Sequence, residues 1–333
     1  MSRSASHSLH QRKPGWKLLG IACLVLLPAI MVACGSDSDG ATGTDAGSTG
    51  TTSKTAASFK TDRALKISAI PDQDPEKLNR LYGDVATYLA DSLGVEVEYV
   101  PVTDYAASVS SFRLGDLDAV WFGGLTGVQA RLQTPGSKLL AQRDIDEKFQ
   151  SVFIANKTAD IAPFDDVNGL SALKAKTLTF GSESSTSGRL MPQYFMDKAG
   201  VSTDDLKGKA GFSGSHDATI ALVDAGTFQV GALNKAVWDA AVKDDKVDTD
   251  RVQVVFTTPT YYDYHWLAGP DLDADFGAGF TAALGDAILA LDPSKPEQAA
   301  ILELFSAGKF IPTKVANYDQ IEEIARKNGL ITE

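Results

Sequence analysis

The sequence predicts an α/β protein built from two lobes, and three observations support this fold class. Short apolar strands alternate with amphipathic helices along the chain, which is typical of a parallel-type sheet covered by helices. Two polar stretches, near residue 157 and near residue 258, mark places where the chain crosses between lobes. Turns of glycine and hydroxyl residues follow several strands, at the sheet edge where such proteins bind ligands.

Residues 1–33 have the pattern of a lipoprotein signal peptide. A segment with four Lys or Arg residues precedes Leu18–Ala33, an uncharged apolar run of 16 residues. That run is shorter than the roughly 20 residues of a membrane-spanning helix and is typical of a secretory signal. It ends in Met31-Val32-Ala33-Cys34, which resembles a bacterial lipobox. We therefore expect Cys34 to carry a lipid and to anchor the protein extracytoplasmically at the cell membrane; the alternative is a plain signal with an incidental cysteine.

Residues 34–62 predict a flexible tether, since Gly, Ser, Thr, Asp and Ala dominate them. The only other cysteine, Cys23, lies inside the signal. The mature protein can therefore form no disulfide, and its stability must come from the core.

The composition is acidic, with 31 basic and 43 acidic residues. Removal of the four basic residues of the signal leaves 27 minus 43, a net charge of −16. Such a charge excludes nucleic acid as a partner, because its binding needs a basic surface. An anionic ligand would have to be held by uncharged dipoles.

We assign residues 63–157 and the return segment 258–333 to the first lobe, and residues 158–257 to the second. In the first segment the expected strands are 65–70, 95–99, 119–124, 138–142 and 150–155, with helices at 75–93, 103–112 and 126–132. The second lobe is expected to hold strands 177–180, 229–233 and 252–256 and helices 190–199, 218–225 and 236–242. The return segment predicts helices at 276–291, 299–305 and 317–327.

The stretch from Lys176 to Tyr194 carries the clearest chemical signal, a strand, a hydroxyl-rich turn and a helix. Ser185, Thr186 and Ser187 place hydroxyls beside the first amides of that helix, which have no intrahelical acceptor and lie at the positive end of its dipole. This arrangement suits a phosphate-like oxyanion without any lysine. The alternative is that Ser185 or Thr186 only caps the helix.

Other candidate residues lie at neighbouring strand ends. His216 is in a second small-residue turn before a helix, and its ring could donate to an oxyanion. Tyr105 either points into the cleft or packs on the sheet edge. Of Trp121 and Phe122 one faces the core and the other the cleft, and we take Phe122 as the candidate ligand contact. Asn234 offers an amide or caps a helix. From the aromatic cluster 261–266 we select Tyr262 as the ligand contact.

Several classes of site are excluded. Two histidines and no cysteine in the mature body make a zinc site improbable, so we expect no metal and no cofactor. The chain has neither a Gly-x-Ser-x-Gly elbow nor a phosphate loop ending in Gly-Lys-Ser or Gly-Lys-Thr. We therefore predict a binding protein rather than an enzyme.

These motifs resemble the substrate-binding proteins of phosphonate-type ABC transporters. The similarity covers about residue 64 to the end and depends on four segments, Thr103–Tyr105, Gly115–Gly123, Ser184–Gly188 and Gly214–Ala218. More narrowly, the chain is similar to a branch often labelled selenate-transporter binding proteins. The resemblance implies a type II periplasmic-binding-protein fold, two lobes joined by a two-segment hinge.

The resemblance also implies how the ligand is held. Ser185, Thr186 and Ser187 would bind an oxyanion while Tyr105 and His216 close on it from other sides. Relatives often have a tyrosine where this chain has Phe122, so one hydroxyl donor is absent. Asn234 stands where relatives that bind aminoalkyl phosphonates would place a carboxylate, so a cationic tail is not provided for.

The implied function is capture of a small tetrahedral oxyanion, phosphonate or phosphite, and delivery to an ABC permease with its ATPase. We expect a monomer. The alternatives are uptake of selenate or sulfate, a sensor subunit, or an enzyme on the same fold that resembles pyrimidine-precursor proteins of thiamine synthesis.

Overall fold

The computed structural model describes Phe59 and residues 61–331. The predicted signal peptide, Cys34 and most of the tether lie outside the described residues. Within that range, no helix is both long and apolar enough to cross a lipid bilayer.

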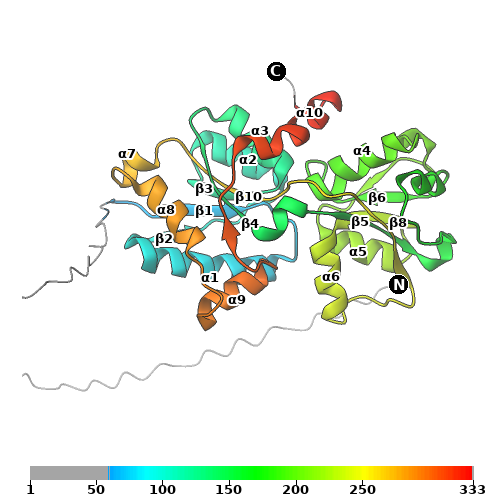
Figure 1. The fold of residues 1–333 in the computed structure, drawn as a ribbon, viewed down its shortest axis with the longest axis horizontal. Coiled ribbons are helices and arrows are strands. Elements are labelled where there is room, and N and C mark those ends of the chain that lie inside the picture. Colours follow the sequence, from blue (N-terminus) through cyan, green and yellow to red (C-terminus); the bar gives the residue numbers. More distant parts are fainter. Residues whose placement is uncertain (1–58, 60, 332–333) are drawn as a thin grey trace, which may run out of the picture. The chain divides into compact units, whose positions relative to one another are not determined.

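Two mixed sheets, each accompanied by helices, form the two lobes (Figure 1). The first lobe has a six-stranded sheet in the order β11 (Phe310–Ile311), β4 (Lys138–Arg143), β10 (His265–Ala268), β3 (Ala119–Phe122), β1 (Leu65–Ala69) and β2 (Val97–Tyr99). The second has five strands in the order β7 (Gly211–Phe212), β6 (Leu178–Phe180), β8 (Val230–Asn234), β5 (Ser151–Asn156) and β9 (Val252–Thr257).

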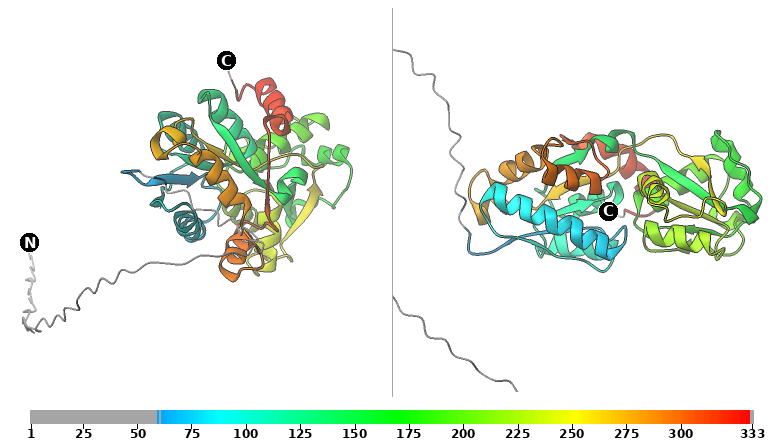
Figure 2. Two further views of the ribbon diagram at one scale, coloured as in Figure 1. Left: turned by 60° about the vertical axis from the view of Figure 1, so that its left-hand side comes forward. Right: turned by 90° about the horizontal axis from the view of Figure 1, so that it is seen from below.

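The helices divide between the lobes in the same way, as the two further views in Figure 2 show. Around the first sheet lie α1 (Pro75–Leu93), α2 (Tyr105–Leu114), α3 (Gly124–Gln133), α7 (Leu272–Phe276), α8 (Phe280–Leu289), α9 (Pro296–Leu304) and α10 (Asp319–Lys327). The second sheet is accompanied by α4 (Met191–Lys198), α5 (His216–Asp224) and α6 (Lys235–Lys243).

Helix α1 forms as its sequence predicts. The Asp74 carboxylate accepts from the amides of Glu76 and Lys77, and Pro75 takes the first helical position. At the other end Gly94 adopts a left-handed φ of 69°. The apolar residues between them are buried in the core of the first lobe.

The first crossing between lobes is not near residue 157, and this corrects the predicted lobe boundary. β5 pairs with β8 and β9, so residues 151–156 already belong to the second lobe. The chain crosses at residues 144–150, and the polar stretch after residue 156 is a turn and loop within the second lobe. The second crossing, residues 258–264, lies where the sequence predicts it.

Two further expectations need correction. Each sheet contains antiparallel pairs as well as parallel ones, because the strands next to the crossings run against their neighbours. The helix expected at 276–291 begins only at Phe280, as α8, because Gly277 and Gly279 adopt φ values of 112° and 85° and separate it from the short helix α7 before it.

A buried ion pair fixes the two crossings to each other. Phe149 and Tyr261 exchange backbone hydrogen bonds of 2.9 and 3.0 Å. Arg143 donates to both carboxylate oxygens of Asp146, at 2.8 and 2.7 Å, and Asp146 also accepts from the amide of Tyr264 at 3.3 Å. The guanidinium lies 4.7 Å from the centre of the Tyr264 ring. Burial disfavours the Arg143 cation, but Asp146 outweighs this and raises the pKa of the guanidinium.

Removal of one member of the Arg143–Asp146 pair should therefore destabilise the folded protein. We expect Asp146→Ala to lower the free energy of unfolding by about 3–5 kcal/mol, because it leaves a buried, uncompensated guanidinium. The control is Asp239→Ala, which breaks the exposed pair with Lys235 and should cost less than about 1 kcal/mol. Urea unfolding of the soluble body measures both, and equal costs would contradict the assigned role of the pair.

Candidate ligand-binding site between the lobes

The hydroxyl turn is a tightly closed loop at the start of a helix. The Ser185 hydroxyl accepts from the Gly188 amide at 2.9 Å, so Ser185 is a helix cap, as the alternative reading of the sequence has it. One π-helical turn, Thr186–Leu190, follows and continues into α4. The Gly188 carbonyl accepts from the Gly181 amide at 2.9 Å. All three hydroxyl residues of the turn are buried.

Thr186 touches the first lobe at the start of α3. Its hydroxyl oxygen accepts from the Leu125 amide at 2.9 Å. The neighbouring Gly124 amide donates to Asp263 Oδ1 at 2.8 Å. A Cβ added at Gly123 would lie 3.3 Å from the Thr186 hydroxyl, a tight contact that would require a shift of a few tenths of an ångström. The starts of α3 and of the π-helical turn thus meet across the interface.

A second contact between the lobes is a network centred on Tyr264. Its hydroxyl donates to Asp72 Oδ2 at 2.8 Å and is approached by His216 Nε2 at 3.3 Å and Asn234 Nδ2 at 3.4 Å. The backbone amide of His216 donates to the Asp72 carbonyl at 2.9 Å. Asn234 also caps α6 by accepting from the Ala236 amide, as the second sequence interpretation of this residue has it.

His216 is neutral in this setting. Complete burial lowers the pKa of its imidazole to about 3. Because the Tyr264 hydroxyl donates its proton to Asp72, it is free to accept from His216 Nε2–H. The imidazole therefore contributes a dipole and not a charge to the interface.

Three buried polar atoms near the turn lack hydrogen-bond partners among residues 61–331. They are the Tyr105 hydroxyl at the first position of α2, the Ser187 hydroxyl in the turn, and Asp263 Oδ2. These residues are 2%, 1% and 1% exposed. Burial raises the pKa of Tyr105 well above its usual value, with Asp72 and Asp263 adding to the effect and the nearby Ser185 hydroxyl opposing it. Tyr105 therefore lies within reach of the hydroxyl turn of the other lobe.

Two buried carboxyls stand beside these donors. Burial raises the pKa of Asp72 to about 6, against the lowering effects of its bond from Tyr264 and of Arg143. Burial likewise raises the pKa of Asp263 to about 7, although the Gly124 amide opposes it. Burial therefore disfavours the ionised form of both carboxyls, and no pKa of this kind is visible in the sequence pattern.

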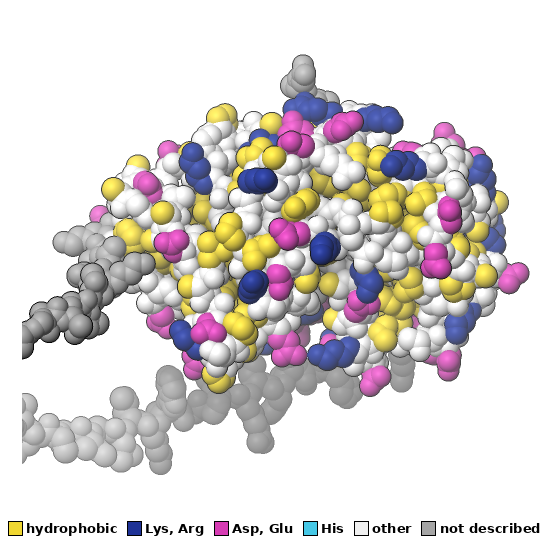
Figure 3. Space-filling view, in the orientation of Figure 1, with side chains coloured by type: hydrophobic (Ala, Val, Ile, Leu, Met, Phe, Trp, Pro, Cys, Tyr) yellow, Lys and Arg dark blue, Asp and Glu magenta, His cyan; other side chains and the backbone are white. Residues whose placement is uncertain are grey.

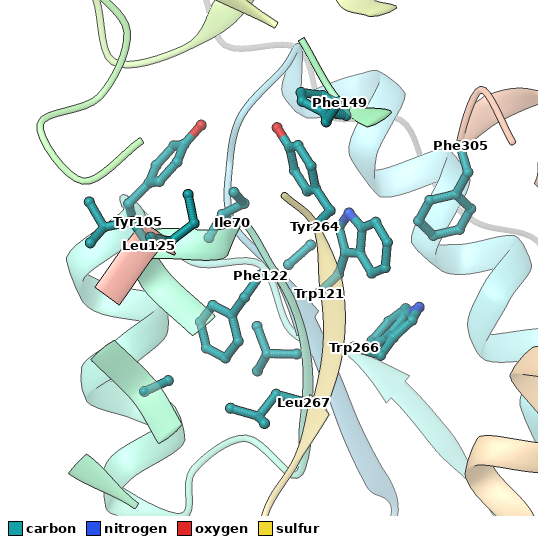
Figure 4. Close-up of a cluster of buried hydrophobic side chains, with 14 of the residues drawn as sticks. Ile70, Tyr105, Trp121, Phe122, Leu125, Phe149, Tyr264, Trp266, Leu267 and Phe305 are labelled. Carbon is teal, nitrogen blue, oxygen red and sulfur yellow. The ribbon is translucent and has the colours of Figure 1, made fainter. Parts of the chain in front are cut away.

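The structure corrects two of the sequence-predicted contacts. Phe122 is fully buried and its ring packs edge-on against Phe112 of α2 at 5.6 Å, and Figure 4 shows it deeper in the first lobe than the hydroxyls of Tyr105 and Tyr264. Trp121 is the member of that pair near the interface, stacked on Tyr264 at 5.7 Å. Tyr262 is partly exposed and packs towards Tyr318.

Sequence reasoning missed Asp72, Asp263 and Tyr264. The first lies in a turn that looked like an ordinary helix start, and the other two lie in the aromatic cluster from which Tyr262 was selected. The sequence did hold a signal for Asp263. An acid within an aromatic cluster needs a hydrogen-bond partner if the cluster is buried.

Comparisons with known proteins identify the family of this chain. Residues 67–318 match the family model described as "ABC transporter, phosphonate, periplasmic substrate-binding protein". The chain belongs to this family. It is therefore an extracytoplasmic substrate-binding protein and not an enzyme, as the sequence predicts.

Individual relatives support the assignment. The chain is 50% identical over 270 residues, 81% of its length and 91% of the relative's, to the probable ABC transporter phosphite binding protein PhnD1 of Prochlorococcus marinus. The solved structure of PhnD1 in complex with methylphosphonate covers 80% of this chain and 99% of its own, with a TM-score of 0.79. The phosphonates-binding periplasmic protein of Escherichia coli is 30% identical over 44% of each chain. The fold is the type II periplasmic-binding-protein fold.

The tight packing of the hydroxyl turn around Gly188 makes this residue sensitive to substitution. A Cβ there would lie 2.9 Å from the Ser185 hydroxyl and 3.2 Å from Gly181 Cα, so Gly188→Ala should cost about 1–3 kcal/mol of stability. Gly83→Ala, in an open position on α1, is the control and should stabilise the protein by about 0.5–1 kcal/mol. Thermal unfolding measures both; a neutral Gly188→Ala would show that the turn is looser than described.

Proposed function

We propose that this protein is the lipid-anchored, monomeric binding component of an ABC importer and captures a small phosphorus oxyanion, a phosphonate or phosphite. The observation that supports this most is the pair of buried hydroxyls, Tyr105 from one lobe and Ser187 from the other, that lack partners in the described part of the chain. An unpartnered buried hydroxyl costs about 1–3 kcal/mol, which a bound oxyanion would recover.

Binding would stabilise the closed arrangement of the lobes. The anion would accept from Tyr105 and from the Ser185–Ser187 turn, groups that lie on both lobes. Only the closed form presents all of them, so a ligand shifts the open–closed equilibrium towards it. Micromolar affinity corresponds to about −8 kcal/mol, and charge-assisted hydrogen bonds contribute roughly 1.5–3 kcal/mol each, so about four or five suffice.

The relatives favour a small substituent on phosphorus. The PhnD1 relative was solved with methylphosphonate and is named as a phosphite-binding protein. The face shown in Figure 3 interleaves acidic and basic side chains, so selection of the anion rests on the interface and not on a basic surface there.

Delivery would require a membrane partner. We assign the permease and ATPase as partners from the family, and the lipid on Cys34 would hold the protein beside them. Cys34→Ala in full-length protein should move it from the membrane fraction to the soluble fraction of its native host, while its ligand affinity stays the same. Membrane retention of the variant would contradict lipid anchoring at this cysteine.

Calorimetric titration of the soluble body with methylphosphonate, phosphite, phosphate, sulfate and selenate tests the ligand class. We expect phosphite or methylphosphonate to bind at micromolar concentration or tighter. If none of the five anions binds, the proposal is wrong; if only selenate or sulfate binds, the transporter assignment stands with another ligand.

Removal of the unpartnered hydroxyls should separate binding from folding. We expect Tyr105→Phe and Ser187→Ala each to weaken binding of the preferred anion roughly 10- to 150-fold, since each deletes one charge-assisted bond of about 1.5–3 kcal/mol. The ligand-free variants should unfold at the same temperature or higher, because an unsatisfied buried group is gone.

The matched control is Thr134→Val. Its hydroxyl is also buried and without a partner in the described residues, but it lies at the far end of α3. This variant should bind as the wild type does. Equal losses of affinity in all three variants would show that the hydroxyls act through general packing.

A further inference from the structure

The loop before α1 and the start of α5 exchange two hydrogen bonds between the lobes, one in each direction. The His216 amide, the first of α5, donates to the Asp72 carbonyl at 2.9 Å. In return, the Asp74 amide of the first lobe donates to Asp217 Oδ2 of the second lobe at 2.6 Å. We call these two bonds the rim contact. They join the lobes directly and involve neither Tyr105 nor the hydroxyl turn.

Asp217 lies between the N-terminal ends of two helices that belong to different lobes. Asp74 immediately precedes Pro75, the first residue of α1, and Asp217 is in the first turn of α5. The free amides at a helix N-terminus carry a partial positive charge, so two such ends repel each other at close range. The Asp217 carboxylate is attracted to both ends. Ser215 already caps α5 by accepting from the Ala218 amide at 3.2 Å, which leaves the Asp217 carboxylate available to the other lobe.

The rim contact differs in exposure from the groups proposed to hold the ligand. Asp74 is exposed and the Asp217 side chain is partly exposed. By contrast, Tyr105 and Ser187 are 2% and 1% exposed. A carboxylate would also repel an anion, whereas it is attracted to the start of α1. The observed bond from Asp217 therefore acts on the other lobe and not on the ligand.

We propose that Asp217 is a positioning residue that sets the fraction of ligand-free protein in the closed form, and through that fraction the affinity for every ligand. This inference rests on the proposed function, in which only the closed form presents all the donors. The apparent dissociation constant is then the intrinsic one divided by the closed fraction. A change at Asp217 should therefore raise the dissociation constants of phosphite and methylphosphonate by one common factor, equal to the factor by which the closed fraction falls.

The test measures the closed fraction and the affinity separately. The mature chain with Cys34→Ala has no cysteine, so Asp84→Cys on α1 and Ala221→Cys on α5, both exposed, provide two unique sites for spin labels. Electron–electron double resonance between the labels gives the closed fraction, and calorimetric titration gives the dissociation constants.

The two variants at Asp217 should have graded effects. Asp217→Ala loses both the charge and the acceptor, so we expect its ligand-free closed fraction to fall about two- to tenfold, with an equal rise of both dissociation constants. Asp217→Asn keeps an acceptor for the Asp74 amide and should show a smaller change. Salt should reduce the difference between wild type and Asp217→Ala, because the carboxylate is partly exposed.

Glu76→Gln is the matched control. Glu76 is an acidic residue in the first turn of α1, next to Asp74 in the chain's first lobe, and its amide, not its carboxylate, is bonded to Asp74. The variant removes one negative charge from the same end of α1 and leaves both bonds of the rim contact in place. Its closed fraction and dissociation constants should stay within about twofold of the wild-type values.

Three outcomes would overturn the inference. They are a wild-type closed fraction and affinity in Asp217→Ala, a loss of affinity at an unchanged closed fraction, and factors that differ between phosphite and methylphosphonate. A purely structural role would lower the unfolding temperature without changing the closed fraction, and Asp217→Asn gives the same test if Asp217→Ala fails to fold. If no anion binds, the proposed function is wrong, whereas the ligand-free closed fraction still decides the role of Asp217.

Discussion

Hydrogen bonding of buried backbone amides is the constraint on which the closed arrangement depends. Closure buries the first amides of α3 and α5, and a buried N–H without an acceptor is costly. The Leu125 amide finds the Thr186 hydroxyl, and the His216 amide finds the Asp72 carbonyl, each in the opposite lobe. The lobes are therefore aligned by pairs of donors and acceptors, which specify one relative position. A ligand that accepts from the remaining donors then adds to an arrangement already fixed.

The carboxyl groups of Asp72 and Asp263 accept hydrogen bonds from donors at the interface and hold these donors in place. This role explains why acidic residues lie beside the proposed anion site. Asp72 takes the Tyr264 hydroxyl and Asp263 takes the Gly124 amide. Arg143, a cation that acts on both carboxyls, is engaged by Asp146 and by the carbonyl of Phe305. It can reduce the local negative potential but has few donors left for a ligand. The anion must consequently be held by neutral groups, which agrees with the acidic net charge of the chain.

The parts of this structure that are local in sequence could be predicted, and the parts set by distant pairing could not. The turn at Ser185 and the helix after Asp74 follow from capping residues and apolar spacing within a few positions. The first crossing was misplaced because β5 is assigned to a lobe by its pairing with β8 and β9, roughly 80–100 residues away. Tyr262 was preferred to Tyr264 because residues 262–264 belong to no regular strand, so alternation gives no guide to their orientation. Phe122 was misplaced because a strand with all four residues buried offers no polar face to mark the cleft.

The second crossing, residues 258–264, connects the two lobes through one network of hydrogen bonds. Tyr261 bonds the Ser151 hydroxyl of β5, Asp263 holds the start of α3, and Tyr264 contacts Asp72, His216 and Asn234. Ser151 in turn donates to the Ser187 carbonyl, which ties the hydroxyl turn to the same segment. A change of backbone angle at residues 261–264 would therefore disturb the donors on both lobes together. Several hydrogen bonds between the lobes therefore depend on the backbone geometry of this one segment. Arg143 and Asp146 make the closed geometry of this segment rigid, because a buried pair tolerates little displacement before its desolvation is no longer offset.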